Sequence, residues 1–202
     1  MYGKLSGLVL GFHGCDKSVC ERVINGDTLT KSNNSYDWLG SGIYFWENDP
    51  QRAYEWALES SKRSHSSIKE PAVIGAVIDL GFCLNLMNRS YNDYIRVCYE
   101  YVIQHYDRIE KDAPQNKDIN GNKDLLLRYL DCAVINEALF LSGESGLYTP
   151  FDTVRGLFTE GNPIYPGAGF TEKTHVQISI VNPNCIKGYF LPRKADLNYP
   201  IP

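Results

Sequence analysis

The spacing of hydrophobic residues changes several times along the chain, which predicts a mixture of strands and helices. Residues 72–80 form a nearly continuous apolar run, too short and too rich in β-branched residues to favour a helix. Residues 174–181 alternate polar and apolar side chains, as a half-buried strand does. Shorter apolar or aromatic stretches predict three more strands, at residues 5–12, 42–46 and 186–191.

Four other segments carry apolar residues at the three-and-four spacing of a helix. A short helix is predicted at 16–25, and a longer one runs from Pro50 to about residue 63. The longer helix begins with a side-chain cap, Asp49, followed by proline at its first position. Residues 91–109 and 123–141 predict two further helices, which are separated by a polar loop.

The order of these elements predicts one α+β domain, residues 1–202, with a helical insertion at about 88–142. A length of 202 residues suits one domain with one core. Residues 143–171 are rich in glycine and proline and are expected to be a loop. No apolar run approaches the roughly 20 residues of a membrane helix, and the first apolar stretch lacks a cleavage site. We therefore expect a cytoplasmic protein without a membrane partner.

Charge and cysteine content narrow the functional classes. The net charge of −4 is unlike that of a general electrostatic nucleic-acid binder. The six cysteines have no metal-site spacing, so we expect reduced, buried thiols and no metal. Cys15 is the one cysteine for which the sequence indicates a reactive thiol. It lies close to His13, and a cationic imidazole would lower the pKa of the thiol.

Residues 36–47, which follow shortly after His13 and Gly14, carry most of the candidate chemistry. Glycines such as Gly42 let the backbone approach a flat ligand, and Tyr44 supplies a ring to stack on it. His13 adds a hydrogen-bonding edge. A single histidine after a strand is more often structural than catalytic, but the neighbouring Gly14 and the glycine–tyrosine segment favour a site. The set suits a nicotinamide riboside better than a phosphate or a metal.

Strand alternation separates the aromatic residues of this segment. It sends Tyr44 and Trp46 to one face of the predicted strand and Phe45 to the other. Phe45 is then the core residue, and Tyr44 is the ring that remains available for stacking.

His13-Gly14, followed by residues 40–45 (Gly-Ser-Gly-Ile-Tyr-Phe) and a helix, resembles the NAD-binding core of the ADP-ribosyltransferase superfamily. The resemblance is to its His-Tyr-Glu branch, which includes diphtheria-toxin-like enzymes and poly(ADP-ribose) polymerases. It covers roughly residues 5–85 and 172–192; residues 86–170 look more like uncharacterised bacterial members. It implies a split antiparallel β-sandwich, with two small sheets around an NAD cleft and flanking helices. NAD is the implied substrate.

The resemblance also implies roles for single residues. His13 would bind a ribose hydroxyl, Gly14 would clamp the carboxamide, and Tyr44 would stack on the nicotinamide. Arg52 occupies the place of a carboxamide-binding serine, and Trp56 or Tyr54 would close the other side of the ring. The implied cofactor-binding set is His13, Gly14, Gly42, Tyr44, Arg52, Trp56 and Arg155.

Arg155 enters this set because an arginine suits bidentate contacts with phosphate. It is a candidate for binding the pyrophosphate or the acceptor. The alternative is a structural salt bridge to Asp152, one turn away.

The third catalytic position departs from the family pattern. Where the family has a glutamate, this chain offers Gln177 or His175 on the last alternating strand. We favour Gln177, so that the predicted catalytic residues are His13, Tyr44 and Gln177. Glutamine binds a hydroxyl but cannot act as a base near neutral pH. Glu172 or Glu160 remains an alternative source of the carboxylate.

These residues predict a mono-ADP-ribosyltransferase that moves ADP-ribose from NAD to a macromolecular acceptor, protein or nucleic acid. Such an enzyme would suit a bacterial or phage toxin or defence effector, with an antitoxin or inhibitor protein as its partner. NAD glycohydrolysis is the first alternative. The second is a catalytically silent module that binds NAD or a partner, which the missing glutamate keeps open.

Overall fold

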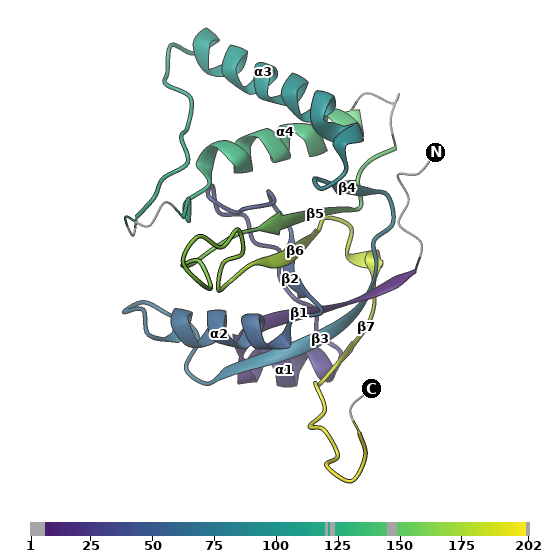
Figure 1. Ribbon diagram of the computed structural model, residues 1–202. Helices are drawn as coiled ribbons and strands as arrows, with labels where there is room; N and C mark the ends of the chain where they lie inside the picture. The colour runs from purple at the N-terminus through teal and green to yellow at the C-terminus, as the bar shows by residue number, and fades with distance from the viewer. Residues whose placement is uncertain (1–6, 120, 122–123, 145–148, 201–202) are drawn as a thin grey trace.

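In a computed structural model the chain folds into a seven-stranded sheet with four α-helices (Figure 1). The structure describes residues 7–119, 121, 124–144 and 149–200, and the counts refer to these. The strands are β1 (Leu8–Asp16), β2 (Ile43–Glu47), β3 (Pro71–Asp79), β4 (Cys83–Asn85), β5 (Thr153–Phe158), β6 (His175–Ile180) and β7 (Ile186–Phe190). The helices are α1 (Lys17–Ile24), α2 (Pro50–Ser61), α3 (Asn92–Arg108) and α4 (Tyr129–Glu144). The strand order is β4-β5-β6-β2-β1-β3-β7.

The sheet consists of two halves with a narrow junction. Strands β1 and β3 pair along nine residues, whereas β1 and β2 pair only at Gly11 with Glu47 and Phe12 with Trp46. In Figure 1, α1 and α2 lie beside β1 and β3, and α3 and α4 lie beside β4 and β5. The α+β class is confirmed. The two expected sheets are instead the halves of one sheet, because β1 and β2 stay hydrogen-bonded at this junction.

The two largest shifts of a predicted boundary are at the end of β1 and at the start of α4. Strand β1 continues through His13 and Gly14 to Asp16, so these residues lie inside the strand rather than after it. Pairing with β3 over its whole described length explains the extension. Helix α4 begins at Tyr129, and before it Leu127 forms an isolated antiparallel bridge with Lys117. Residues 5, 6, 122 and 123, which fall within or next to predicted elements, lie outside the described residues.

Residues 143–171, expected to be a loop, contain strand β5. It pairs antiparallel with β6 from Thr153 to Phe158 and parallel with β4. The strand has only six residues, and glycine- and proline-rich segments flank it. Its identity as a strand therefore depends on partners that are distant in the sequence. Residues 145–148 of the expected loop are outside the described part.

Helix α2 packs closely on β1. Ala53 and Ala57 are fully buried, whereas Trp56 and Ser60, also expected inside, are only half-buried. A Cβ atom on Gly14 would lie 2.1 Å from the Ala53 carbonyl oxygen, so only glycine permits this approach.

Burial in the structure agrees with two predictions, the alternation of side chains along β2 and the burial of the cysteine thiols. Phe45 is fully buried, as the strand alternation of β2 predicts. All six cysteines are free and buried, as expected from the sequence. In the first helix Val23 is buried and Ile24 is 41% exposed, so only part of the predicted inward face is confirmed. No helix within the described residues is long and apolar enough to cross a membrane.

Candidate functional site

His13 lies where β1 and β2 separate. Their last paired residues are Phe12 and Trp46, and directly beyond them His13 Nδ1 donates a hydrogen bond to the Tyr44 carbonyl oxygen at 2.7 Å. The imidazole thus replaces a backbone bond that the diverging strands cannot make. Burial lowers the pKa of His13 below its ordinary value of 6.5, partly offset by this hydrogen bond. His13 is therefore neutral at pH 7.

Tyr44 contacts the glycine turn with its side chain and His13 with its backbone. The hydroxyl donates to the Gly40 carbonyl at 2.6 Å and accepts from the Leu39 amide at 2.8 Å. Burial raises the pKa of Tyr44, so the phenol stays protonated. Within the described structure, His13 and Tyr44 are therefore joined through the Tyr44 backbone rather than ring to ring.

Close packing by itself requires glycine at both glycine positions of the predicted site. Gly14 admits α2, as described above. A Cβ atom on Gly42 would lie 2.1 Å from Ser179 Oγ and 2.9 Å from the Ile180 carbonyl oxygen, so Gly42 admits β6. The glycine spacing is thus explained by strand and helix contacts, whether or not a ligand approaches.

Gln177 is held in the middle of the sheet. Strand β6 places it opposite Trp46 of β2 and opposite Gly156 of β5. Its side chain is 8% exposed and has no hydrogen-bond partner among the residues that the structure describes. Alternation puts Gln177, Trp46 and Tyr44 on one face of adjacent strands. Because Phe12 pairs with Trp46, the His13 ring lies on the opposite face, 5.8 Å from the ring of Phe45. The amide thus keeps both its donor and its acceptor free.

The alternatives to Gln177 occupy different surroundings. His175 Nδ1 donates to the Lys173 carbonyl oxygen at 2.6 Å, and its ring lies among Trp38, Trp46 and Phe158. Burial lowers the pKa of His175. Glu172 is exposed and accepts hydrogen bonds from Asn162, away from this aromatic cluster.

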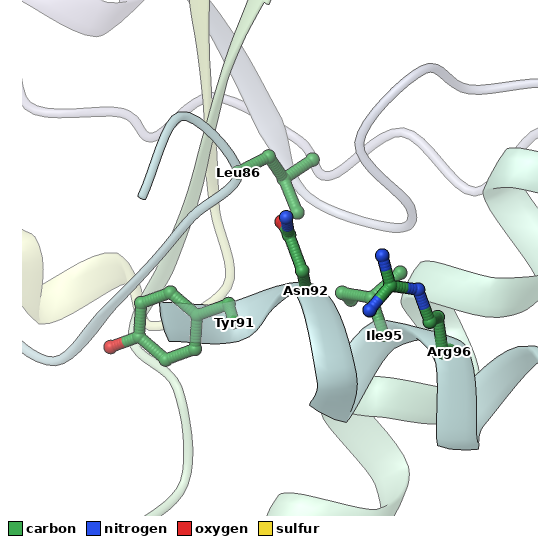
Figure 2. Close-up of a pocket in the computed structure, with 5 residues that line it drawn as sticks. All are labelled: Leu86, Tyr91, Asn92, Ile95 and Arg96. Atoms are coloured by element: carbon green, nitrogen blue, oxygen red, sulfur yellow. The ribbon is translucent and has the colours of Figure 1, made fainter. Parts of the chain in front are cut away.

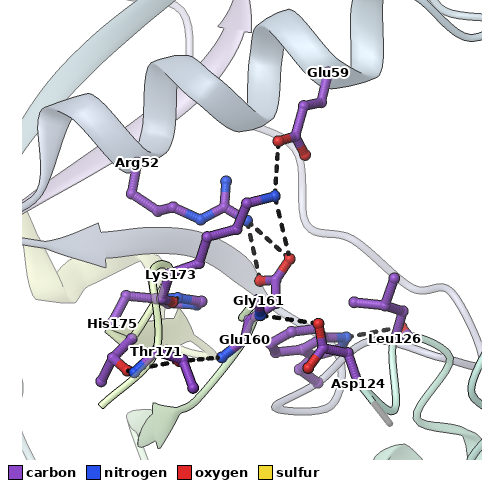
Figure 3. Close-up of polar contacts among 11 residues, drawn as sticks. Arg52, Glu59, Asp124, Leu126, Glu160, Gly161, Thr171, Lys173 and His175 are labelled. Atoms are coloured by element: carbon purple, nitrogen blue, oxygen red, sulfur yellow. Dashed lines mark hydrogen bonds and ion pairs between the residues drawn. The ribbon is translucent and has the colours of Figure 1, made fainter. Parts of the chain in front are cut away.

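Glu160, the remaining carboxylate, forms a buried ion pair with Arg52 of α2 (Figure 3). Arg52 Nη2 lies 3.0 Å and 3.3 Å from the two carboxylate oxygens. Lys173 extends the network, with its Nζ atom 2.9 Å from Glu59 Oε1 and 3.9 Å from Glu160 Oε1. Figure 3 shows how Lys173 and Glu160 reach from the β5–β6 connection to α2. Sequence reasoning missed Lys173 and Glu59, since no local pattern marks partners more than 100 residues apart.

Arg155 has a different partner from the one predicted. Its Nε and Nη2 atoms bond both carboxylate oxygens of Glu47, with 2.8 Å between Nη2 and Oε1, and this contact raises the pKa of Arg155. The alternative of a salt bridge to Asp152 is wrong. Asp152 accepts from the Phe82 amide and the Asn182 side chain. The segment is a strand, in which residues three apart are separated by about 10 Å rather than one helical turn.

The other predicted contact residues lie on α2. Trp56 is half-buried, with its ring centroid 5.7 Å from that of Trp46. Tyr54 is 46% exposed. Trp56 thus lies beside the aromatic residues around His175 (Trp38, Trp46 and Phe158), whereas the Tyr54 side chain is exposed to solvent.

A surface pocket lies elsewhere, at the start of α3 (Figure 2). Its volume is about 340 Å³, and it is lined by Leu86, Tyr91, Asn92, Ile95 and Arg96. None of the predicted site residues lines it. Within the described ranges, no group of three or more His, Cys, Asp or Glu side chains is arranged to hold a metal.

Comparisons with known proteins leave the family open. No family model matches the chain. An uncharacterised protein of Methanocaldococcus jannaschii is 27% identical over 197 residues, covering 87% of this chain and 83% of that protein. The crystal structure of an anti-CRISPR protein aligns with 92% of this chain and 97% of its own, at 12% identity and a TM-score of 0.36. That score is too low to support a common fold.

Proposed function

We propose that the protein transfers a single ADP-ribose from NAD to a macromolecular acceptor. The observation that carries the proposal is the bond between His13 Nδ1 and the Tyr44 carbonyl at 2.7 Å. It brings the His-Gly pair against the Gly-Ser-Gly-Ile-Tyr-Phe segment, the two motifs on which the resemblance rests. Gln177 lies on β6, the next strand beyond β2, so the three predicted residues come from three adjacent strands.

The hydrogen-bonding groups suit the binding of a ribose. Because His13 Nδ1 donates to Tyr44, the neutral ring leaves Nε2 as an acceptor for a hydroxyl proton. The Gln177 amide both donates and accepts, which suits a hydroxyl on its own face of the sheet, opposite to the face of the His13 ring. Holding the ribose through His13 favours attack by an oriented acceptor.

The transfer breaks the bond between nicotinamide and ribose. Nicotinamide leaves with the bonding electron pair, positive charge develops on the sugar, and the acceptor nucleophile supplies the new pair and loses its proton to water. Gln177 cannot remove the acceptor's proton at neutral pH, so the proposal is single transfer rather than polymer growth. Glu160 does not replace it in this arrangement, since its carboxylate is paired with Arg52.

A catalytically silent, NAD-binding module is the second candidate. It is favoured by Gln177 at the position of a carboxylate and by the Tyr44 hydroxyl, which is bonded to Gly40 and Leu39. We attach a role as a toxin or defence effector, with an inhibitor protein as partner, to the proposal of ADP-ribose transfer. This role requires that transfer occurs.

Nicotinamide release from NAD tests these candidates. Release that requires an added protein or nucleic-acid acceptor supports transfer, and release into water alone supports glycohydrolysis. NAD binding without release supports the silent module, and neither binding nor release contradicts both proposals. His13→Ala should abolish release, while the matched control His65→Ala, which alters an exposed histidine, should not.

A further inference from the structure

Arg52 is a buried cation that uses little of its hydrogen-bonding capacity. Its side chain is 7% exposed, and only Nη2 contacts Glu160. Nε and Nη1 are buried and have no partner within the described residues. Buried polar groups are hydrogen-bonded in more than about 90% of cases, because an unmade bond leaves the full desolvation penalty. The free donors of Arg52 therefore require an explanation.

Two more unpaired polar atoms lie in the same cluster. Trp46 Nε1, a donor, is buried without a partner in the described part of the chain, and the Arg52 guanidinium lies 5.8 Å from the Trp46 ring centroid. His175 Nε2 is likewise buried and unpaired, with its ring 6.3 Å from that of Trp46. The three side chains come from α2, β2 and β6. Unpaired polar atoms from three separate elements thus lie on neighbouring buried side chains: the N–H donors of Arg52 and Trp46, and His175 Nε2, which is an acceptor in the neutral ring.

The way in which Glu160 binds Arg52 also indicates a replaceable partner. Both carboxylate oxygens contact the single nitrogen Nη2. Bidentate recognition of an oxyanion by arginine instead uses two nitrogens in parallel. Neither two-nitrogen edge of Arg52 is satisfied in this contact. By contrast, Arg155 binds Glu47 through Nε and Nη2 in the bidentate manner.

We infer that Arg52, Trp46 and His175 form a binding subsite for a phosphate oxyanion, which Glu160 occupies from within the chain until a ligand displaces it. The unpaired donors of this cluster, Arg52 Nε, Arg52 Nη1 and Trp46 Nε1, combined with the fixed charge of Arg52, suit an anion better than a neutral group. His175 can donate from Nε2 only when it is protonated. Because Glu160 and Lys173 close the cluster against α2, ligand entry requires Glu160 to leave Arg52 (Figure 3).

The phosphate can come from two sources, the pyrophosphate of NAD or the backbone of a nucleic-acid acceptor. Only the assignment to NAD or to an acceptor rests on the proposed function. Binding of inorganic pyrophosphate does not depend on turnover. If pyrophosphate binds and no nicotinamide is released, the subsite stands and the proposed activity fails.

Calorimetric titration with inorganic pyrophosphate at low ionic strength is the test. We expect Arg52→Lys, which keeps the charge but loses the planar donors, to weaken binding by on the order of tenfold. Glu160→Gln, which removes the competing carboxylate, should strengthen it by a similar factor. These opposite effects would not arise from a purely structural ion pair. Equal weakening by both variants, or no binding by the wild type, overturns the inference.

Two further variants guard against misfolding, since a single change leaves one buried charge unpaired. The double variant Arg52→Gln/Glu160→Gln removes both charges, and its melting curve should show a folded protein that does not bind pyrophosphate. The surface control Arg22→Gln, in an exposed pair with Asp27, should bind as the wild type does. Retained binding in the folded double variant contradicts the subsite.

Competition then separates the two sources. Displacement of pyrophosphate by ADP-ribose at comparable concentration assigns the subsite to NAD. Displacement only by a single-stranded oligonucleotide assigns it to the acceptor. Displacement by neither contradicts a role for the subsite in recognising phosphate-bearing substrates.

Discussion

His13 Nδ1 lies 2.7 Å from the carbonyl oxygen of Tyr44, directly beyond the last residue pair that joins β1 to β2. This bond adds to the two residue pairs of the described β1–β2 ladder and to the backbone bond from the Asn48 amide to the Leu10 carbonyl oxygen, which together join the two halves of the sheet. The histidine of the first motif therefore has a structural role at the junction as well as a proposed catalytic one. Experiments on this residue must measure stability and activity separately.

Tyr44→Phe separates the hydroxyl of Tyr44 from its ring. The hydroxyl bonds Leu39 and Gly40, so its loss should lower the free energy of unfolding by about 1–3 kcal/mol. Nicotinamide release should fall by no more than about threefold if the ring acts by stacking. Tyr44→Ala, which removes the ring together with the hydroxyl, should lose both stability and nicotinamide release. Urea unfolding measures the stability of each variant, and the NAD assay measures its nicotinamide release. A Tyr44→Phe variant that is stable but releases no nicotinamide would contradict stacking as the main role of Tyr44.

Gln177→Ala should reduce nicotinamide release by roughly a hundredfold, since the amide is assigned to a ribose hydroxyl. Glu172 is exposed and lies away from the aromatic cluster, so Glu172→Ala should change release by less than about twofold. The comparison is made at saturating NAD, with folding verified by circular dichroism. The reverse order of effects would move the third position to Glu172.

Gly14→Ala should destabilise the protein strongly. The added methyl group would meet the Ala53 carbonyl oxygen at 2.1 Å and push α2 away from β1. Overpacking of this kind costs about 1–3 kcal/mol. Gly188→Ala is the matched control, because its added methyl group meets nothing within 4 Å, and its effect should stay within about 0.5 kcal/mol. Equal melting temperatures for the two variants would contradict the close packing of α2.

The protein should lose stability as the pH falls below about 7. Burial lowers the pKa of both His13 and His175 from the ordinary value of 6.5. Below that value the unfolded chain binds protons that the folded chain does not, so the free energy of unfolding decreases as the pH falls. Melting temperatures measured between pH 7.5 and about 5.5 should show this decline.

Replacing both histidines by glutamine should flatten the dependence in that range. His65→Gln, a change at an exposed position, should leave it intact. A decline of the same steepness in the double variant would assign it to other groups.

Arg155 should be energetically coupled to Glu47 and not to Asp152. In a double-mutant cycle with Arg155→Met and Glu47→Gln, the coupling energy should be on the order of 1–3 kcal/mol, because the pair is bidentate and mostly buried. The corresponding cycle with Asp152→Asn should give a value near zero. Appreciable coupling to Asp152 alone would restore the salt bridge expected from the sequence.

Local patterns in the sequence determined the α+β class and most of the elements. The run at 72–80 specifies a strand by its β-branched residues, and Asp49-Pro50 specifies the start of a helix through capping. Strand alternation within 42–46 placed Phe45 in the core. Each of these features depends on neighbours within a few residues, which the sequence displays directly.

Contacts between distant residues were decided only by the tertiary structure. Strand β5 is short and lacks a pattern of its own, and pairing with β6 makes it a strand. Arg52 meets Glu160, and Arg155 meets Glu47, across 108 residues of chain. An arginine in isolation indicates only that it requires an anion; which carboxylate reaches it depends on how the sheet brings its strands together. The sequence therefore determined the chemistry available to the site, and the order of the strands determined which groups meet.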